Sequence, residues 1–112
     1  MGDRIDTFDV RLIDEAIADV RAIKTYIEQD LNNPAAAMRV VDSIFDAARS
    51  LSTLPRRNRV LAKHGELEVR AAQAGKYLLL YIIQGSVVKI FTVIYSARDV
   101  RTRLASLIDR LD

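Results

Sequence analysis

The chain has no cysteine and only one histidine, His64, among its 112 residues. The absence of cysteine excludes disulfides and thiolate chemistry, and it fits a reducing cytoplasm. A single histidine cannot build a metal site alone, and no carboxylates are spaced around His64 as metal ligands would be. We therefore expect neither a metal ion nor another cofactor.

Glycine and long apolar runs are also scarce. The four glycines are scattered at positions 2, 65, 75 and 85, so there is no glycine-rich phosphate loop. No apolar run approaches the roughly 18–20 residues of a membrane span. The segment Met1–Asp6 lacks the basic-then-apolar pattern of a secretory signal. We therefore expect a cytoplasmic protein that does not enter a membrane, and the length predicts one domain over residues 1–112.

Acidic residues are nearly missing from one long segment. Residues 47–98 carry nine Lys or Arg and only two acids, whereas residues 1–46 carry ten acids and five bases. Residues 99–112 carry three of each, so the net charge of +2 divides into −5, +7 and 0. Charge segregated in this way favours a polyanionic or acidic partner for the basic segment. The plainer interpretation is that these charges only decorate solvated faces.

The N-terminal half predicts a strand followed by two helices. Apolar and polar residues alternate over 7–12, which is typical of a half-buried strand, and Asp14 is expected to cap the next helix. Apolar residues then recur every three or four positions over 17–31 and again over 37–51. The link Asn32-Asn33-Pro34 is short, so the two helices are expected to form an antiparallel hairpin.

The C-terminal half predicts a sheet and a final helix. Pro55 is expected to end the second helix and residues 56–66 to form a polar, basic loop. Apolar and β-branched runs predict strands at 67–74, 77–83 and 87–95, with turns at Gly75 and 84–86, and a helix at about 99–111. The order predicts an α+β fold: an N-terminal strand, then an antiparallel two-helix hairpin packed on a twisted antiparallel sheet (β-α-α-β-β-β), plus a C-terminal helix.

Several short segments form an ordered set along the chain: Tyr26–Ala36, Leu51–Pro55 followed by Arg57, Arg70 seven residues before the Tyr77-x-x-x-Tyr81 strand, and Val93–Asp99. This set resembles the RelE/ParE superfamily, the toxins of bacterial type II toxin–antitoxin systems that include plasmid stabilisation proteins. The resemblance covers nearly the whole chain. It implies a toxin that inhibits growth, either by binding DNA gyrase as ParE-like members do or by cleaving mRNA on the ribosome as RelE-like members do.

Cleavage of RNA by its 2′-OH needs a proton acceptor, a cation for the phosphate charge and a proton donor for the leaving oxygen. By resemblance to RelE-like toxins, the candidate catalytic residues are Arg70, Lys76, Tyr95 and Arg98. Two positions depart from that pattern. RelE-like toxins carry a tyrosine shortly after the last-strand arginine, but the residue six positions past Arg98 is Leu104.

The second departure is Gln73, which stands about where a RelE-like enzyme would hold a catalytic arginine. The ending from Arg98 to Leu111 instead resembles the arginine- and leucine-rich helix of the ParE branch. We therefore favour gyrase as the target and keep ribosome-dependent mRNA cleavage as the alternative. A third possibility is a binding or dimerisation module of the same fold that is not toxic.

The remaining basic residues are candidates for binding nucleic acid or a protein partner: Arg56, Arg57, Arg59, Lys63, Arg101 and Arg103. Antitoxins of the family inhibit their toxins through an acidic tail that orders on binding, so the resemblance implies a cognate acidic antitoxin. The expected partners are this antitoxin together with gyrase, or with the ribosome and its mRNA. A homodimer and a toxin–antitoxin hetero-oligomer are both compatible with the sequence.

Overall fold

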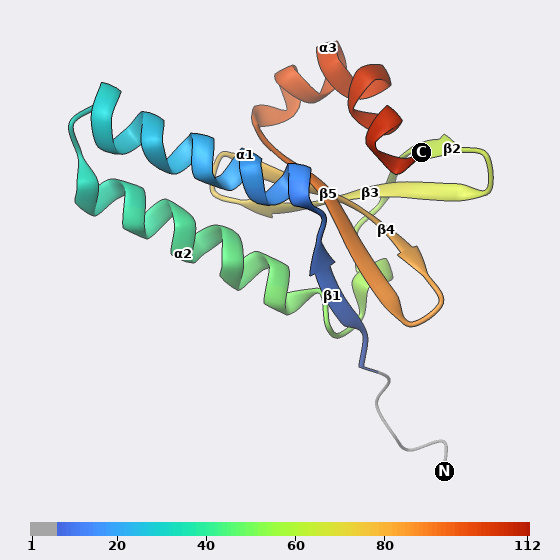
Figure 1. The fold of residues 1–112 in the computed structure, drawn as a ribbon. Helices are drawn as coiled ribbons and strands as arrows, with labels where there is room; N and C mark the ends of the chain where they lie inside the picture. The colour runs from blue at the N-terminus through green and yellow to red at the C-terminus, as the bar shows by residue number, and fades with distance from the viewer. Residues whose placement is uncertain (1–6) are drawn as a thin grey trace.

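The computed structural model describes residues 7–112 and contains five strands and three α-helices in that range (Figure 1). They are β1 (Asp9–Leu12), α1 (Asp14–Thr25), α2 (Pro34–Ser50), β2 (Val60–His64), β3 (Leu67–Ala74), β4 (Tyr77–Gln84), β5 (Val87–Tyr95) and α3 (Ser96–Ile108). A π-helical turn, Tyr26–Asp30, extends α1, and short 3-10 turns occur at Pro55–Arg57 and Asp109–Leu111. The expectation about a secretory signal in Met1–Asp6 lies outside the described residues.

The five strands form one sheet in the order β1-β5-β4-β3-β2. Neighbouring strands are antiparallel except β1 and β5, which run parallel from the pair Asp9 and Val87 to the pair Leu12 and Ile90. The hairpin of α1 and α2 lies against one face of the sheet, and α3 lies on the other (Figure 1). The predicted α+β fold is confirmed, with this parallel pair as an added feature.

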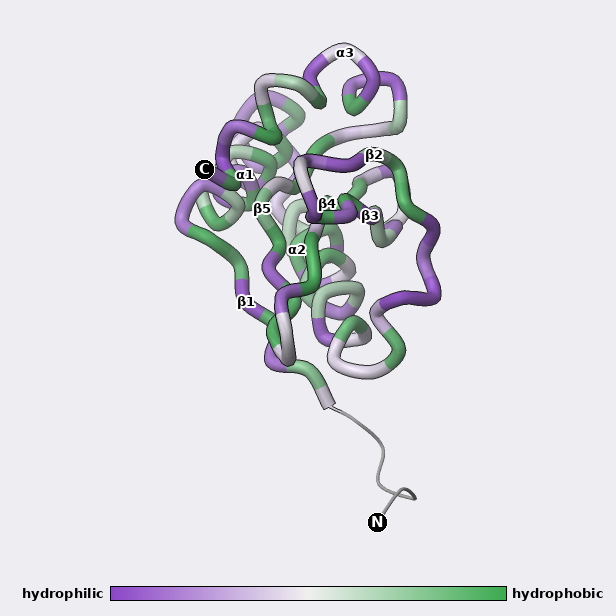
Figure 2. Tube along the Cα trace, turned by 90° about the vertical axis from the view of Figure 1, so that its right-hand side faces the viewer, coloured by the Kyte–Doolittle hydropathy of each residue, from purple (hydrophilic) through white to green (hydrophobic). Residues whose placement is uncertain are grey.

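Two apolar cores lie on the two faces of the sheet, and β4 supplies both because its side chains alternate. Leu79 and Tyr81 of β4 pack in the core beneath the hairpin, whereas Leu80 and Ile82 pack in the core beneath α3. The central strands are mostly hydrophobic, while hydrophilic residues lie mainly on the outer segments (Figure 2). The prediction that the run 77–83 is a central strand covered on both faces is therefore confirmed.

The segment 56–66, expected as a loop, contains the edge strand β2 instead. Its residues alternate between half-buried and exposed, and Ala62 packs against the core beneath α3. The strand was missed because Arg59 and Lys63 make it polar and because the register shifts between Val60 and Ala62, which interrupts the pairing with β3. Charged residues and a bulge are common at the edges of sheets.

Two helix starts differ from the sequence prediction in detail, and a third agrees with it. Asp14 is the first residue of α1 and its side chain makes no cap hydrogen bond, so its predicted capping role is wrong. Asn33 does cap α2, because its side-chain oxygen accepts a hydrogen bond from the Ala36 N–H at 3.0 Å. The last helix begins directly after β5 at Ser96, three residues earlier than expected.

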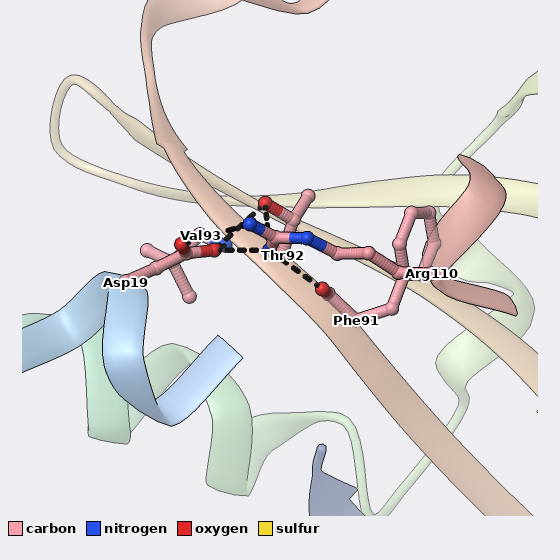
Figure 3. Close-up of polar contacts among 5 residues, drawn as sticks. All are labelled: Asp19, Phe91, Thr92, Val93 and Arg110. Atoms are coloured by element: carbon pink, nitrogen blue, oxygen red, sulfur yellow. Dashed lines mark hydrogen bonds and ion pairs between the residues drawn. The ribbon is translucent and has the colours of Figure 1, made fainter. Parts of the chain in front are cut away.

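β1 pairs with β5 only as far as Ile90. Beyond that point, an ion pair between Asp19 of α1 and Arg110 binds the free edge of β5 (Figure 3). Phe91 is an extra residue in β5 that has no partner on β4, so the local ladder is interrupted. Asp19 accepts hydrogen bonds from the Val93 N–H at 3.0 Å and the Thr92 hydroxyl at 2.8 Å, and Arg110 donates to the Phe91 carbonyl at 3.1 Å. This clasp, made of Asp19, Arg110 and residues 91–93, connects the hairpin layer to the end of the α3 layer.

No helix among the described residues is long and apolar enough to cross a membrane.

Candidate functional site

An open groove lies between α3 and the sheet, and its lining includes two basic residues. This α3 groove has a volume of about 530 Å³ and is lined by Asn58, Arg59, Leu61, Ala71, Gln73, Leu78, Ala97, Val100, Arg101 and Leu104. Leucines and alanines supply its apolar wall, while Arg59 comes from the segment before β2 and Arg101 from α3. Two segments far apart in sequence thus bring two arginines to one cavity.

The cations around the α3 groove have no acidic partner within residues 7–112. Arg59, Lys76, Arg98 and Arg101 are exposed, and none of them forms an ion pair with another described residue. Lys76 lines a smaller cavity that shares Gln73, Leu78 and Ala97 with the groove. An exposed cluster of uncompensated positive charge attracts an anionic ligand or an acidic protein surface.

Arg70, a candidate catalytic residue, is instead held by hydrogen bonds beneath the loop after α2. Its guanidinium donates to the carbonyls of Arg56 at 3.1 Å and of Asn58, and it pairs with Glu68 at 3.1 Å. Only 12% of its side chain is exposed. These contacts fix the loop to the sheet, which is a structural role and leaves Arg70 outside the lining of the α3 groove.

Tyr95 lies on the hairpin face of the sheet and packs edge-on against Tyr77, with ring centroids 5.3 Å apart. Burial raises the pKa of Tyr77 above its ordinary value, and the neighbouring tyrosines Tyr95 and Tyr26 add to the shift. None of the four candidate catalytic residues lines the α3 groove. Lys76 lines the smaller adjoining cavity and Arg98 directly follows Ala97, which lines both cavities, whereas Arg70 and Tyr95 line neither.

A second groove lies where the turn that joins the two helices of the hairpin meets β4 and β5. This hairpin groove is mainly apolar and has a volume of about 710 Å³, and it is lined by Ala22, Ile23, Tyr26, Ile27, Leu31, Ala36, Tyr77 and Tyr95. Tyr26, Leu31 and Tyr95 are 53%, 55% and 48% exposed. An adjoining cavity that shares Ala36 and both β-strand tyrosines adds Arg39 and Lys76 at its border. Large apolar side chains left open to solvent in one place are typical of a docking surface.

The other predicted binding residues are spread over several elements. Arg56 stacks over the Phe8 ring at 5.8 Å, and Arg57 donates to the Thr53 carbonyl at 3.2 Å and the Ser50 hydroxyl at 3.0 Å. Lys63 is exposed on β2, and Arg103 is exposed on α3. Of the six predicted binding residues, the structure brings Arg59 and Arg101 together at the α3 groove.

Polar contacts that the sequence did not indicate include the Asp19–Arg110 clasp and a contact between His64 and Asp112 at 2.8 Å. No pattern of spacing connects Asp19 to a residue 91 positions later, so only the fold reveals this pair. Among the described residues, no group of three or more His, Cys, Asp or Glu side chains is placed to hold a metal ion.

The sequence profile of one protein family matches residues 10–100, and that family is described as the ParE toxin of the type II toxin–antitoxin system parDE. The match spans most of the chain, so the protein belongs to the ParE toxin family. This confirms the resemblance to the RelE/ParE superfamily. No protein of curated function matches the sequence.

Solved structures share the fold at low sequence identity. A chain of the chromosomal ParDE system from P. aeruginosa is 14% identical with a TM-score of 0.67, covering 81% of this chain and 98% of that one. A chain of the RelBE2 toxin–antitoxin complex from Mycobacterium tuberculosis is 23% identical, with a TM-score of 0.59 and coverage of 80% and 98%. A chain of the archaeal RelE–RelB complex from Pyrococcus horikoshii OT3 is 17% identical, with a TM-score of 0.58 and coverage of 82% and 98%.

Proposed function

We propose that this protein is the toxic component of a type II toxin–antitoxin module and that it arrests growth by binding DNA gyrase in the cytoplasm. Its family membership supports the toxin role. The choice of gyrase rests on the chemistry of the α3 groove, which suits binding better than proton transfer. A cognate acidic antitoxin binds the toxin and neutralises it.

The observation that carries the choice of target is the absence of a proton-transfer group from the lining of the α3 groove. Its polar side chains within the described residues are two arginines and two amides, Asn58 and Gln73. Arginine stays protonated and an amide does not titrate, so neither can exchange a proton near neutral pH. RelE-like toxins resemble one another in carrying a tyrosine shortly after the last-strand arginine. Here Leu104 lies six positions past Arg98, and its side chain packs against the apolar core beneath α3.

The alternative, ribosome-dependent mRNA cleavage, is favoured by one feature of the structure. The Ser96 N–H donates to the Lys76 carbonyl at 2.8 Å, which keeps Lys76 close to the start of α3, where Arg98 lies. Two cations at one end of a groove suit a phosphate group. In this alternative Lys76 and Arg98 would bind the scissile phosphate, and Arg70 and Tyr95 would have to move to contribute. The third possibility, a non-toxic binding or dimerisation module, needs no movement and no target.

The hairpin groove is the surface that we assign to the antitoxin. Its exposed tyrosines and leucine would bury the apolar side chains of a partner segment, and Arg39 and Lys76 at its border would attract acidic residues of that segment. The α3 groove lies on the opposite face of the sheet. This arrangement leaves a bound antitoxin and a bound target on different faces.

Two assays with purified protein test the proposal. We expect the toxin to inhibit DNA supercoiling by gyrase and to leave the DNA cleaved, in reactions without ribosomes. Cleavage of mRNA that depends on added ribosomes, with no effect on gyrase, would instead establish the alternative. Inactivity in both assays, together with normal growth when the protein is produced in bacteria, would establish the non-toxic module.

A further inference from the structure

The loop between α2 and β2 presents one leucine to solvent in an unusual backbone conformation. Leu54 is 72% exposed, more than any other large hydrophobic side chain among the described residues. Its φ and ψ are both +50°, which is the left-handed helical region. Cβ crowds the carbonyl oxygen in this region, so branched and bulky residues seldom occupy it. Pro55 follows directly and restricts the backbone of Leu54 further.

A single exposed leucine is common on protein surfaces, but this position combines exposure with strain. Glycine or asparagine would occupy the same backbone conformation at a lower cost. The hydrophobic side chain also gains nothing from the fold, because most of its surface stays in water. Neither local conformation nor packing therefore explains a leucine here, whereas contact with a partner would.

Hydrogen bonds from buried and half-buried side chains hold the loop around Leu54 in place. The Tyr81 hydroxyl donates to the Pro55 carbonyl and accepts from the Asn58 amide at 3.0 Å. Arg70 donates to the carbonyls of Arg56 and Asn58. Because Tyr81 is fully buried in the sheet, the loop is anchored to the rigid centre of the molecule. A contact residue held this firmly loses little conformational entropy when it binds.

The charges beside Leu54 indicate the chemistry of the partner. Arg56, Arg57 and Arg59 follow it within five positions, and none of them pairs with an acid of residues 7–112. A leucine closely followed by three arginines in one loop fits an apolar socket bordered by carboxylates. Such a socket belongs to a protein, since the phosphate backbone of a nucleic acid offers a leucine nothing to bury against.

We propose that Leu54 is an anchor residue that inserts into an apolar, acid-bordered socket on the protein that the toxin inhibits. The inference rests on the proposed function and adds a contact outside both grooves. Arg56, Arg57 and Arg59 follow the anchor in the same loop and match the acidic border of the socket. The strained backbone of Leu54 is then the cost of directing its side chain away from the toxin.

Leu54→Gly separates binding from stability, because it removes the anchor and relieves the backbone strain together. We expect the variant to melt no lower than the unmodified protein and to inhibit gyrase supercoiling at least about tenfold more weakly. Leu54→Met keeps an apolar side chain and should retain inhibition. The matched control is Met38→Ala, which removes an apolar side chain that is 52% exposed on α2 and belongs to neither groove. It should leave inhibition unchanged.

The outcomes distinguish this inference from the proposed function. An unmodified toxin that inhibits gyrase and a Leu54→Gly variant that inhibits it equally well would overturn the anchor and leave the function standing. An unmodified toxin that does not affect gyrase would overturn the function and, with it, the assignment of Leu54 to that target. A Leu54→Gly variant that melts clearly lower than the unmodified protein would show that Leu54 serves the fold, which also overturns the inference.

Discussion

Replacing Asp19 by alanine is expected to destabilise the protein strongly although Asp19 lines neither groove. The carboxylate accepts four hydrogen bonds, from the Thr92 hydroxyl, the Val93 N–H and both terminal nitrogens of Arg110 (Figure 3). The side chains of Asp19 and Arg110 are only 20% and 22% exposed. Without Asp19, the partly buried guanidinium of Arg110 loses its counter-ion and the Val93 N–H loses its acceptor.

The expected cost is about 2–3 kcal/mol of unfolding free energy, below the roughly 3–5 kcal/mol for breaking a fully buried ion pair because water still reaches this one. A loss of this size is a large part of the roughly 5–15 kcal/mol that stabilises a typical domain. Urea denaturation of Asp19→Ala, Arg110→Ala and the double variant measures it. The coupling energy of this cycle should be about 1–2 kcal/mol.

A matched control uses the exposed pair of Arg11 and Asp9, whose side chains are 66% and 57% exposed. The same cycle at this pair should give a coupling of less than about 0.5 kcal/mol. Hydrogen exchange at the Val93 amide should also accelerate in Asp19→Ala, because that N–H donates to Asp19. A cost below about 1 kcal/mol, or a coupling no larger than that of the control pair, would refute the role of the clasp.

Three further predictions concern the grooves and the loop. The double variant Arg59→Glu, Arg101→Glu should inhibit gyrase at least about tenfold more weakly, and its stability should not change because both side chains are exposed. The control Arg21→Glu on α1 should have no effect on either property. Supercoiling assays and melting curves measure the two properties. Tyr26→Asp should weaken rescue by the proposed acidic antitoxin, measured as growth on co-expression, because it places a carboxylate in the hairpin groove. Burial raises the pKa of Tyr81 in the folded state above its ordinary value. The protonated hydroxyl therefore stabilises the fold fully below the unfolded-state pKa, and this stabilisation is lost as the pH rises through the folded-state pKa. Tyr81→Phe should reduce this alkaline loss in denaturation measurements and cost about 1–2 kcal/mol at neutral pH, because the Pro55 carbonyl loses its donor.

The sequence predicted the elements whose hydrophobic period is unambiguous. The apolar face over 37–51 and the continuous runs in β4 and β5 decide both the type of element and its place in the fold. Edge strand β2 was not predicted, because a short strand with one bulge and alternating basic residues has the composition of a loop. The hairpin and the central strands therefore follow from local pattern, whereas the sheet edge does not.

The candidate site was less predictable, because it depends on which side chains share a face of the sheet. Arg59 and Arg101 are far apart in sequence and meet at the α3 groove only through the packing of α3. In the sequence, Arg70 is as good a candidate for binding a ligand as these two arginines. In the structure its guanidinium instead donates hydrogen bonds to carbonyls of the loop before β2. The positive φ of Leu54 has no signal in the sequence, since leucine is not the residue that a left-handed position normally selects.

The most direct test of the account is a gyrase supercoiling reaction titrated with the purified toxin and analysed for cleaved DNA. We expect supercoiling to stop and cleaved DNA to accumulate in the absence of ribosomes, with the Arg59→Glu, Arg101→Glu double variant at least about tenfold less active. Full supercoiling at every toxin concentration, combined with cleavage of mRNA on added ribosomes, would contradict the account.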